Sequence, residues 1–291
     1  MSDGGAERAS RTAVVVCQGR AVADGRIAVG RFADPAALPL LREDEKALVR
    51  LVRAGSPPRG WQARFAYEMV RASGEIVVPR TVAIDEAVRG GPRGQTVILG
   101  AGLDGRAWRM PELAGAPVFE VDQPASQHDK RRRAAALGER QPTYVPVDFG
   151  RDSLGDALAA AGHRASTPTT WVWEGVIPYL TPAQVAATVA AVAILSAPGS
   201  RLVANYQSAS AAARIGLLTS RIFAGVAWRS SMWAREPWRS TWTPAAMGEL
   251  LLAHGFTVRS DDDLLTVARG LPMTPRQLGS LRTGRVTVAD R

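Results

Sequence analysis

Cysteine and histidine are scarce in this chain of 291 residues. The one cysteine, Cys17, excludes a disulfide framework within the chain and favours an intracellular, cytoplasmic protein. The three histidines, His128, His163 and His254, lie far apart and have no cysteine partners, so we expect no metal site. They also form no Ser-His-Asp set, and we predict no catalytic acid or base.

Lysine is almost absent, with Lys46 and Lys130 alone, although 36 basic residues face 27 acidic ones and the net charge is +9. This skew toward arginine is typical of GC-rich codons, so the charge says little about function. We interpret the basic cluster at 130–133 as the solvated face of a helix. Nucleic-acid binding stays open as an alternative, but we do not expect it.

Long apolar runs are also missing. The longest, at 185–197, is rich in alanine, stops at Pro198 and is too short to span a bilayer, so we interpret it as a buried helix. The first dozen residues are polar, and the apolar run at 14–16 is too short for a signal sequence. We therefore expect neither a membrane partner nor a secretory leader, and we predict a disordered N-terminus over 1–9.

The chain changes its pattern near residue 95. Apolar residues at helical spacing in 43–54 and 61–72, separated by a Gly-Ser-Pro-Pro break, predict a helical cap over 10–94. Beyond it, apolar strands alternate with helical segments, which predicts an α/β fold with a doubly wound, mostly parallel sheet. The expected strands are 96–100, 117–122, 143–149, 169–175 and 201–206. The expected helices between them are 124–137, 153–162 and 182–196.

The C-terminal third is less regular. We place the core domain at 95–270, with a tryptophan-rich helical insertion at about 207–243 after the fifth strand. Two apolar segments within 256–268, FTVRS and LLTVA, predict a closing antiparallel pair at the sheet edge. We interpret residues 271–291 as a C-terminal tail.

A glycine-rich turn follows the first expected strand. Residues 100–105 read GAGLDG, which is the G-x-G-x-x-G spacing of a phosphate-binding turn. Such a turn can cradle a dinucleotide, wrap another nucleoside cofactor or be purely structural. The glycines alone leave these three interpretations open.

Acidic residues at three other strand ends favour one of them. Asp122, Asp148 and Glu174 end the second, third and fourth expected strands, and ligands of open α/β sheets bind at this edge. Three carboxylates repel a pyrophosphate, but they suit hydroxyls, an exocyclic amine, an ammonium and a sulfonium cation. Pro111 also cuts short the helix that a dinucleotide motif usually opens. The residues therefore favour S-adenosyl-L-methionine, while a nicotinamide dinucleotide or no cofactor stays open.

Several segments together resemble the leucine carboxyl methyltransferase family, including its bacterial branch of small-molecule O-methyltransferases. They are VILGAGLDGRAWRM, VFEVDQP, PVDF and WVWEGVIPYLTP, with SRTA, RFADPAA and PRTVAID toward the N-terminus. Their order and spacing are more specific than any one of them. The resemblance implies a Rossmann-like methyltransferase core with a helical N-terminal cap.

The resemblance also implies roles for individual residues. Arg80 matches the arginine that grips the carboxylate of the cofactor, Asp122 the ribose acid, and Glu174 the acid beside the amino-acid end. Asp148 and Phe149 match the pair that lines the adenine, and Gly100 matches the close-approach glycine. The predicted cofactor-binding set is Arg80, Gly100, Ala101, Gly102, Asp122, Gln123, Asp148, Phe149 and Glu174.

Some positions depart from the family pattern. Gly105 and Trp108 replace the usual threonine and tyrosine, and Pro178 stands where a larger apolar residue is common. Arg11 is only a candidate for the basic residue near the start of some members. On the substrate side, core packing is the alternative to substrate contact, but we predict contact for Asn205, Tyr206, Tyr179, Trp228 and Trp233.

The resulting hypothesis is an S-adenosylmethionine-dependent O-methyltransferase of secondary metabolism. The expected substrate is a small-molecule or peptide carboxylic acid, because a carboxylate is already ionised at neutral pH and needs no general base. The alternatives are methylation of a phenol or amine, a non-catalytic cofactor-binding protein, and a nicotinamide oxidoreductase. The sequence leaves the identity of the acceptor and the oligomeric state open.

Overall fold

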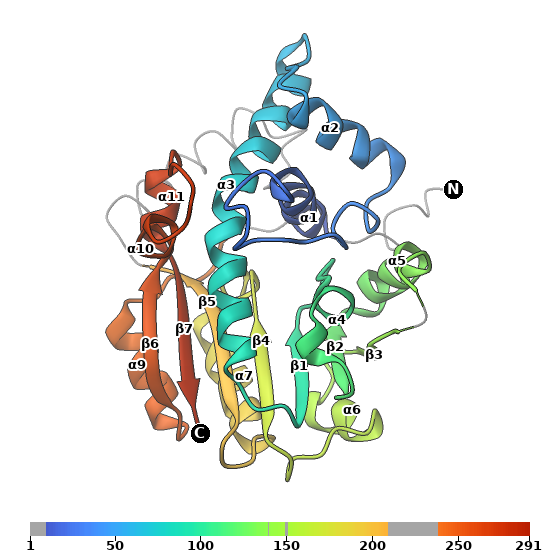
Figure 1. The fold of residues 1–291 in the computed structure, drawn as a ribbon. Helices are drawn as coiled ribbons and strands as arrows, with labels where there is room; N and C mark the ends of the chain where they lie inside the picture. The colour runs from blue at the N-terminus through green and yellow to red at the C-terminus, as the bar shows by residue number, and fades with distance from the viewer. Residues whose placement is uncertain (1–9, 139, 149–150, 209–237) are drawn as a thin grey trace.

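A seven-stranded mixed sheet forms the centre of the computed structural model, which describes residues 10–138, 140–148, 151–208 and 238–291 (Figure 1). The strand order is β3-β2-β1-β4-β5-β7-β6; β1 to β5 are parallel, and β7 runs antiparallel to β5 and β6. This confirms the doubly wound, mostly parallel sheet. The strands are β1 (Gln95–Leu99), β2 (Val118–Asp122), β3 (Thr143–Pro146), β4 (Thr169–Trp173), β5 (Arg201–Gln207), β6 (Thr257–Asp263) and β7 (Gly284–Asp290).

Helices cover both faces of this sheet. Alternate strand residues point to opposite faces, so Val97 and Leu99 pack in one core and Ile98 in the other. The first core is closed by α6 (Leu154–Ala160), α7 (Pro182–Ile194) and α9 (Pro244–Ala253). The second core is closed by the C-terminal half of α3 (Trp61–Arg89), with α10 (Leu264–Arg269) and α11 (Leu278–Thr283).

The long helix α3 also joins the sheet to the N-terminal helices, as its course in Figure 1 shows. Its N-terminal half packs with α1 (Arg11–Ala23) and α2 (Glu43–Arg53) around a separate core that includes Cys17, Val49 and Tyr67. The helices α1 and α3 meet closely at Gly19, where an added Cβ would lie 2.6 Å from the hydroxyl of Ser73. The core around Cys17 also includes Leu103 of the glycine-rich turn and Ala134, so it joins the N-terminal helices to the rest of the chain.

The helices between the parallel strands lie where the sequence predicts them. The helix α5 (Pro124–Ala134) follows β2, and α6 and α7 follow β3 and β4. Thr181 begins α7 with a reciprocal cap: its hydroxyl accepts from the backbone N–H of Gln184, and the side-chain oxygen of Gln184 accepts from the backbone N–H of Thr181. After the glycine-rich turn, α4 (Arg106–Arg109) ends before Pro111 and a short 3-10 turn follows.

The C-terminal residues differ from the prediction at two places. The segment LLTVA is not a strand but belongs to helix α10, because Asp263 caps it by accepting from the N–H of Thr266 at 2.8 Å. The partner of β6 is instead β7, which lies between β5 and β6. Residues 284–290 therefore belong to the sheet rather than to a tail.

The basic cluster at 130–133 also differs from a solvated helix face. Lys130 is 1% exposed and its ammonium lies 2.6 Å from Oε2 of Glu120. Arg133 is bound to Asp129 and Glu45, with its Nε–H donating to Asp129 at 2.9 Å. Only Arg131 and Arg132 are exposed. The cluster fastens α5 to β2 and to the cap through buried ion pairs.

Candidate functional site

The carboxyl ends of β1 and β4 meet at the centre of the sheet, where the strand order reverses direction. This switch point is where open α/β sheets bind their ligands. The turn at 100–105 leaves β1 here, Asp122 ends β2, and Glu174 follows β4 directly. The structure thus brings together the glycine-rich turn and two of the three predicted acids.

The backbone of the turn has the conformation that its glycines permit. Gly100 and Gly102 have φ of +64° and +46°, and the N–H of Gly100 donates to the carbonyl of Val121 at 2.8 Å. The N–H of Gly102 donates to Oδ2 of Asp122 at 2.6 Å, and the N–H of Gln123 donates to Oδ1 at 2.7 Å. The carboxylate of Asp122 therefore fixes the glycine-rich turn and lies directly against it. This is the turn that the sequence predicts to hold a nucleoside.

Glu174 lies at the centre of a buried cluster of arginines. Its Oε1 accepts from Nη2 of Arg20 at 2.7 Å and from Nε of Arg80 at 2.8 Å, while Oε2 accepts from Nη1 of Arg106 at 2.7 Å. Burial raises the pKa of Glu174, but the charges of these three arginines outweigh it and hold the pKa well below its usual value. The carboxylate is thus ionised throughout the neutral pH range.

The cluster is larger than this and its charges balance. Arg109 binds both oxygens of Asp85 at 2.6 and 2.9 Å, and Arg106 binds Asp85 and Asp104. Asp34 lies 3.4 Å from Nε of Arg109. Four arginines and four carboxylates from α1, the cap loop, α3, the turn, α4 and the end of β4 make up this ionic network: Arg20, Arg80, Arg106, Arg109, Asp34, Asp85, Asp104 and Glu174.

Arg80 differs from the other arginines of the ionic network. Burial lowers its pKa and Glu174 only partly offsets this, whereas the pKa values of Arg20, Arg106 and Arg109 are raised by their carboxylate partners despite burial. Arg80 uses only its Nε toward Glu174. Within the described part of the chain its two terminal nitrogens have no acceptor. Among the four arginines of the ionic network, Arg80 is thus the one whose charge is least compensated by carboxylates.

Sequence reasoning missed six members of the ionic network, although five of them lie in segments that carry the family resemblance. Arg106 and Arg109 are in VILGAGLDGRAWRM together with Asp104, Asp34 is in RFADPAA, and Asp85 is in PRTVAID. Charged residues that recur in otherwise apolar segments were the available signal. Arg20, which follows SRTA by several residues, carries no such signal.

The predicted adenine pair is described only in part. Asp148 follows β3 and is about half exposed, with its N–H donating to Asp152 at 2.8 Å and Arg151 nearby at 3.8 Å. Phe149 lies outside the described residues. Gln123 begins α5 as an exposed cap residue, and Ala101 is buried within the turn.

The predicted substrate residues are dispersed. Asn205 is buried and donates to the carbonyl of Arg285 at 2.9 Å, and Tyr206 is buried with its hydroxyl donating to Asp261 at 2.5 Å. Tyr179 is partly exposed in the turn at Ile177–Tyr179 that follows Glu174. Trp228 and Trp233 lie outside the described residues. Substrate contact stays a prediction for all five.

The segment that returns from the insertion reaches this same turn. The N–H of Arg239 donates to the carbonyl of Pro178 at 2.6 Å, and the hydroxyl of Ser240 donates to the carbonyl of Ile177 at 3.0 Å. Trp242 donates its indole N–H to Ser240 at 3.3 Å. Residues 238–243 therefore border the loop beyond Glu174.

Arg11, the candidate for the basic residue near the start of some family members, is exposed in the first turn of α1.

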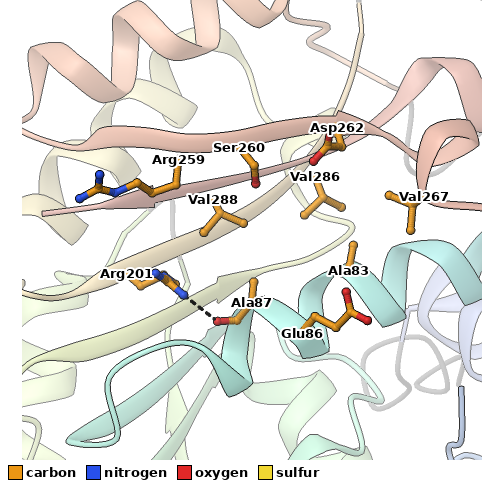
Figure 2. A pocket seen from close by; sticks show the side chains of 10 residues that line it. All are labelled: Ala83, Glu86, Ala87, Arg201, Arg259, Ser260, Asp262, Val267, Val286 and Val288. Carbon is orange, nitrogen blue, oxygen red and sulfur yellow. Dashed lines mark hydrogen bonds between the residues drawn. The ribbon is translucent and has the colours of Figure 1, made fainter. Parts of the chain in front are cut away.

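A separate surface pocket of about 350 Å³ opens between α3 and the strands β6 and β7 (Figure 2). Val286 and Val288 line its interior, and Arg201 points across it to donate to the carbonyl of Ala87 at 3.3 Å. None of its lining residues belongs to the glycine-rich turn or to the ionic network. The pocket is therefore distinct from the candidate site.

The described residues contain neither a metal-binding cluster nor a helix that could span a membrane. Over these residues, no group of three or more His, Cys, Asp or Glu side chains is placed to hold a metal ion. Nor is any helix of the described segments long and apolar enough to cross a membrane.

Solved structures share this architecture at low sequence identity. A protein from Thermobifida fusca, provisionally named a methyltransferase, aligns over 98% of this chain and 96% of its own, with a TM-score of 0.56 and 16% identity. An S-adenosylmethionine-dependent methyltransferase from Mesorhizobium loti covers 75% of this chain and 100% of its own, with a TM-score of 0.50 and 15% identity. The fold is the Rossmann-like fold of S-adenosylmethionine-dependent methyltransferases.

The family follows from the sequence. Residues 13–193, more than half of the chain, match the sequence profile of the leucine carboxyl methyltransferase family, and the chain belongs to this family. A relative from Mycolicibacterium paratuberculosis is 37% identical over 179 residues, which are 60% of this chain and 58% of the relative. A relative from Mycobacterium marinum is 37% identical over 203 residues, 67% of this chain and 65% of the relative.

Both relatives are provisionally named S-adenosyl-L-methionine-dependent methyltransferases. The aligned part spans less than two thirds of the length of each.

Proposed function

We propose that the chain is an S-adenosyl-L-methionine-dependent O-methyltransferase that forms a methyl ester on a small-molecule or peptide carboxylic acid. Membership of the family and the names of the relatives support the methyl transfer. The observation that carries the proposal is the pair Arg80 and Glu174 at the switch point of the sheet. Arg80 is a cation with unused hydrogen-bond donors, and Glu174 is an anion with an unused acceptor position.

This pair fits the amino-acid end of the cofactor, which carries a carboxylate and an ammonium. The two terminal nitrogens of Arg80 form the planar fork that binds a carboxylate through two hydrogen bonds. A carboxylate offers about four acceptor positions, and three on Glu174 are taken by arginines, so one is left for an ammonium donor. Asp122, beside the glycine-rich turn, would accept from the ribose hydroxyls, and Asp148 would lie at the adenine.

In this mechanism the chain positions the cofactor and the acceptor, and it transfers no proton. When bound, the cofactor would supply a methyl group on a sulfonium: the bond from the ionised acceptor oxygen to the methyl carbon would form as the carbon–sulfur bond breaks, and the neutral thioether, S-adenosylhomocysteine, would leave. Glu174 and Arg80 hold the amino-acid end of the cofactor in place. The turn at Ile177–Tyr179 and residues 238–243 border the site beyond Glu174 and would exclude water from it.

Two of the three histidines, His163 and His254, are engaged elsewhere, which favours a carboxylate acceptor over a phenol or an amine, since these must lose a proton. His163 is buried, lies against the rings of Phe119 and Trp171, and has its pKa lowered by burial. His254 ends α9, with Nδ1 2.9 Å from the carbonyl of Leu250. Both are engaged away from the switch point. Methylation of a phenol or amine is the alternative.

Ligand binding tests the cofactor. Thermal unfolding would be followed with S-adenosylhomocysteine and, separately, with NAD and NADP. A ligand at about a hundred times its dissociation constant stabilises by roughly 2.7 kcal/mol, so we expect a clear rise in Tm with S-adenosylhomocysteine alone. A rise with NAD or NADP alone would refute the assignment.

The chemistry of the product tests the acceptor. Carboxylic acids would be incubated with the chain and methyl-labelled S-adenosylmethionine, and the labelled product treated with mild alkali. An ester releases labelled methanol, whereas a methylated phenol or amine is stable to base. Cofactor binding without turnover of any acceptor would indicate a non-catalytic binding protein.

A further inference from the structure

We propose that Arg106 is a positioning residue that orients the carboxylate of Glu174 toward the amino-acid end of the cofactor. The inference rests on the proposed function, because it assumes that S-adenosylmethionine binds at this site. Arg106 itself need not touch the cofactor. It would act through its hydrogen bond to the carboxylate of Glu174.

Arg106 is held more firmly than an ordinary ion-pair partner. Its side chain is 0% exposed, and Nε donates to Oδ1 of Asp85 at 2.8 Å. Nη1 donates to Asp104 and also to Oε2 of Glu174, the latter at 2.7 Å. Its backbone N–H donates to Oδ1 of Asp104 at 2.7 Å. The main chain and the side chain of Arg106 are therefore both fixed, so its guanidinium holds Oε2 of Glu174 in a defined position.

The two oxygens of Glu174 are anchored differently. Oε1 accepts from Arg20 and Arg80, whereas Oε2 accepts from Arg106 alone among the described residues. The terminal torsion of a glutamate is broad, so the direction of its carboxylate is set by the groups that bind its oxygens. Removing the anchor on Oε2 would leave this torsion restrained through Oε1 alone. The acceptor position left for an ammonium would then no longer point in one direction.

A lysine cannot replace Arg106 in this role. The planar guanidinium presents donors in fixed directions and reaches Asp85, Asp104 and Glu174 together, whereas an ammonium is a compact point charge on a flexible stem. Arg106→Lys keeps the charge of the ionic network while losing the geometry. Any loss of binding then reports on orientation rather than on charge.

The chain offers a matched control on the same helix. The side chain of Arg109 is also buried, at 4% exposed; it also belongs to the ionic network and binds Asp85, but no hydrogen bond or ion pair joins it to Glu174. Arg109→Lys therefore disturbs the network to a comparable degree without releasing Oε2. A general weakening of the network would affect both variants alike.

The experiment compares two ligands by calorimetry on the full chain. S-adenosylhomocysteine carries the amino-acid end, and 5′-methylthioadenosine lacks it. For Arg106→Lys we expect affinity for S-adenosylhomocysteine to fall about tenfold or more, with affinity for 5′-methylthioadenosine within about twofold of the unchanged chain. For Arg109→Lys the ratio of the two affinities should stay within about twofold.

The outcomes separate this inference from the proposed function. If the unchanged chain does not bind S-adenosylhomocysteine, the proposed function fails and the role of Arg106 falls with it. If the unchanged chain binds but Arg106→Lys weakens both ligands equally, or Arg109→Lys gives the same selective loss, then Arg106 is merely structural.

A second variant covers the case in which Arg106→Lys does not fold. Asp85→Asn keeps Arg106 in place but weakens the anchor on its Nε. It should give a smaller loss that is again selective for S-adenosylhomocysteine and exceeds that of Arg109→Lys. An equal loss for the two ligands would overturn the inference.

Discussion

The ammonium of Lys130 lies 2.6 Å from Oε2 of Glu120, and the two side chains are 1% and 0% exposed. The pair joins α5 to β2. The ammonium also lies 5.5 Å from the ring centre of Trp108, which follows the glycine-rich turn. Burial raises the pKa of Glu120 to about 7, and Lys130 opposes this rise. Two buried charges thus depend on each other.

Lys130→Met should be strongly destabilising at alkaline pH. Removing one partner leaves an uncompensated buried carboxylate, which costs about 3–5 kcal/mol. The pKa of Glu120 lies above its unfolded value, so the folded state binds the extra proton, and its stability falls as pH rises between the two values. Without Lys130 this pKa rises further. Urea unfolding should therefore show a larger loss at pH 8 than at pH 5.

Two further variants check the cause. Glu120→Gln combined with Lys130→Met removes both charges and should recover much of the loss at pH 8. Arg132→Met changes an exposed neighbour on the same helix and should stay within about 0.5 kcal/mol of the unchanged chain. A loss for Lys130→Met that is equal at both pH values would mean that Glu120 is not its cause.

Gly100→Ala should destabilise the chain through a specific clash. A Cβ at this position would lie 2.3 Å from Cγ2 of Val176, and φ is +64°. Gly55 has the same φ of +64°, and a Cβ there would meet nothing within 4 Å. Gly55→Ala therefore measures the backbone strain alone, about 1–2 kcal/mol, and Gly100→Ala should cost more. The measurement is the free energy of unfolding in urea.

The clash can be relieved in a second step. Val176→Ala removes the methyl group that the new Cβ would meet, so the combination with Gly100→Ala should be less destabilised than the sum of the two single changes. Strict additivity would indicate that the turn moves as a whole and that contact with Val176 is not limiting.

Local sequence patterns predicted the parts of this fold that local interactions determine. The apolar strands and the break at Pro111 are short-range signals, and so is the position of Asp122 and Glu174 at strand ends. The segment LLTVA was misassigned because five apolar or β-branched residues fit a strand as well as a helix, and the cap from Asp263 decides between them.

Local sequence patterns could not predict ion pairs between residues that lie far apart in the chain. Arg20 and Glu174 are separated by 154 residues, and nothing near Arg20 in the sequence indicates its partner. Lys130 looked like part of a solvated run because its three neighbours are arginines, whereas its burial depends on Glu120 in another element. The ionic network and the true partner of β6 become visible only once the chain is folded.

Asp122→Asn should weaken binding of S-adenosylhomocysteine by about tenfold or more, which corresponds to about 1.4 kcal/mol. The amide keeps one acceptor for the N–H of Gly102 or of Gln123, so the turn is retained, but it lacks the charge and acceptors to serve the ribose hydroxyls as well. Calorimetric titration measures the change. An unaltered dissociation constant would remove Asp122 from the cofactor site.

Tyr206→Phe distinguishes packing from contact with the acceptor. The hydroxyl of Tyr206 donates to Oδ2 of Asp261, whose Oδ1 accepts from Arg285 at 2.8 Å, so the three side chains link β5, β6 and β7. Losing the hydroxyl deprives a carboxylate of one donor and should lower the free energy of unfolding by about 1–3 kcal/mol. Affinity for S-adenosylhomocysteine should not change, because Asp261 and Arg285 lie outside the ionic network. A variant that keeps full stability but raises KM for a carboxylic acid would instead assign the hydroxyl to the acceptor, as the sequence predicts.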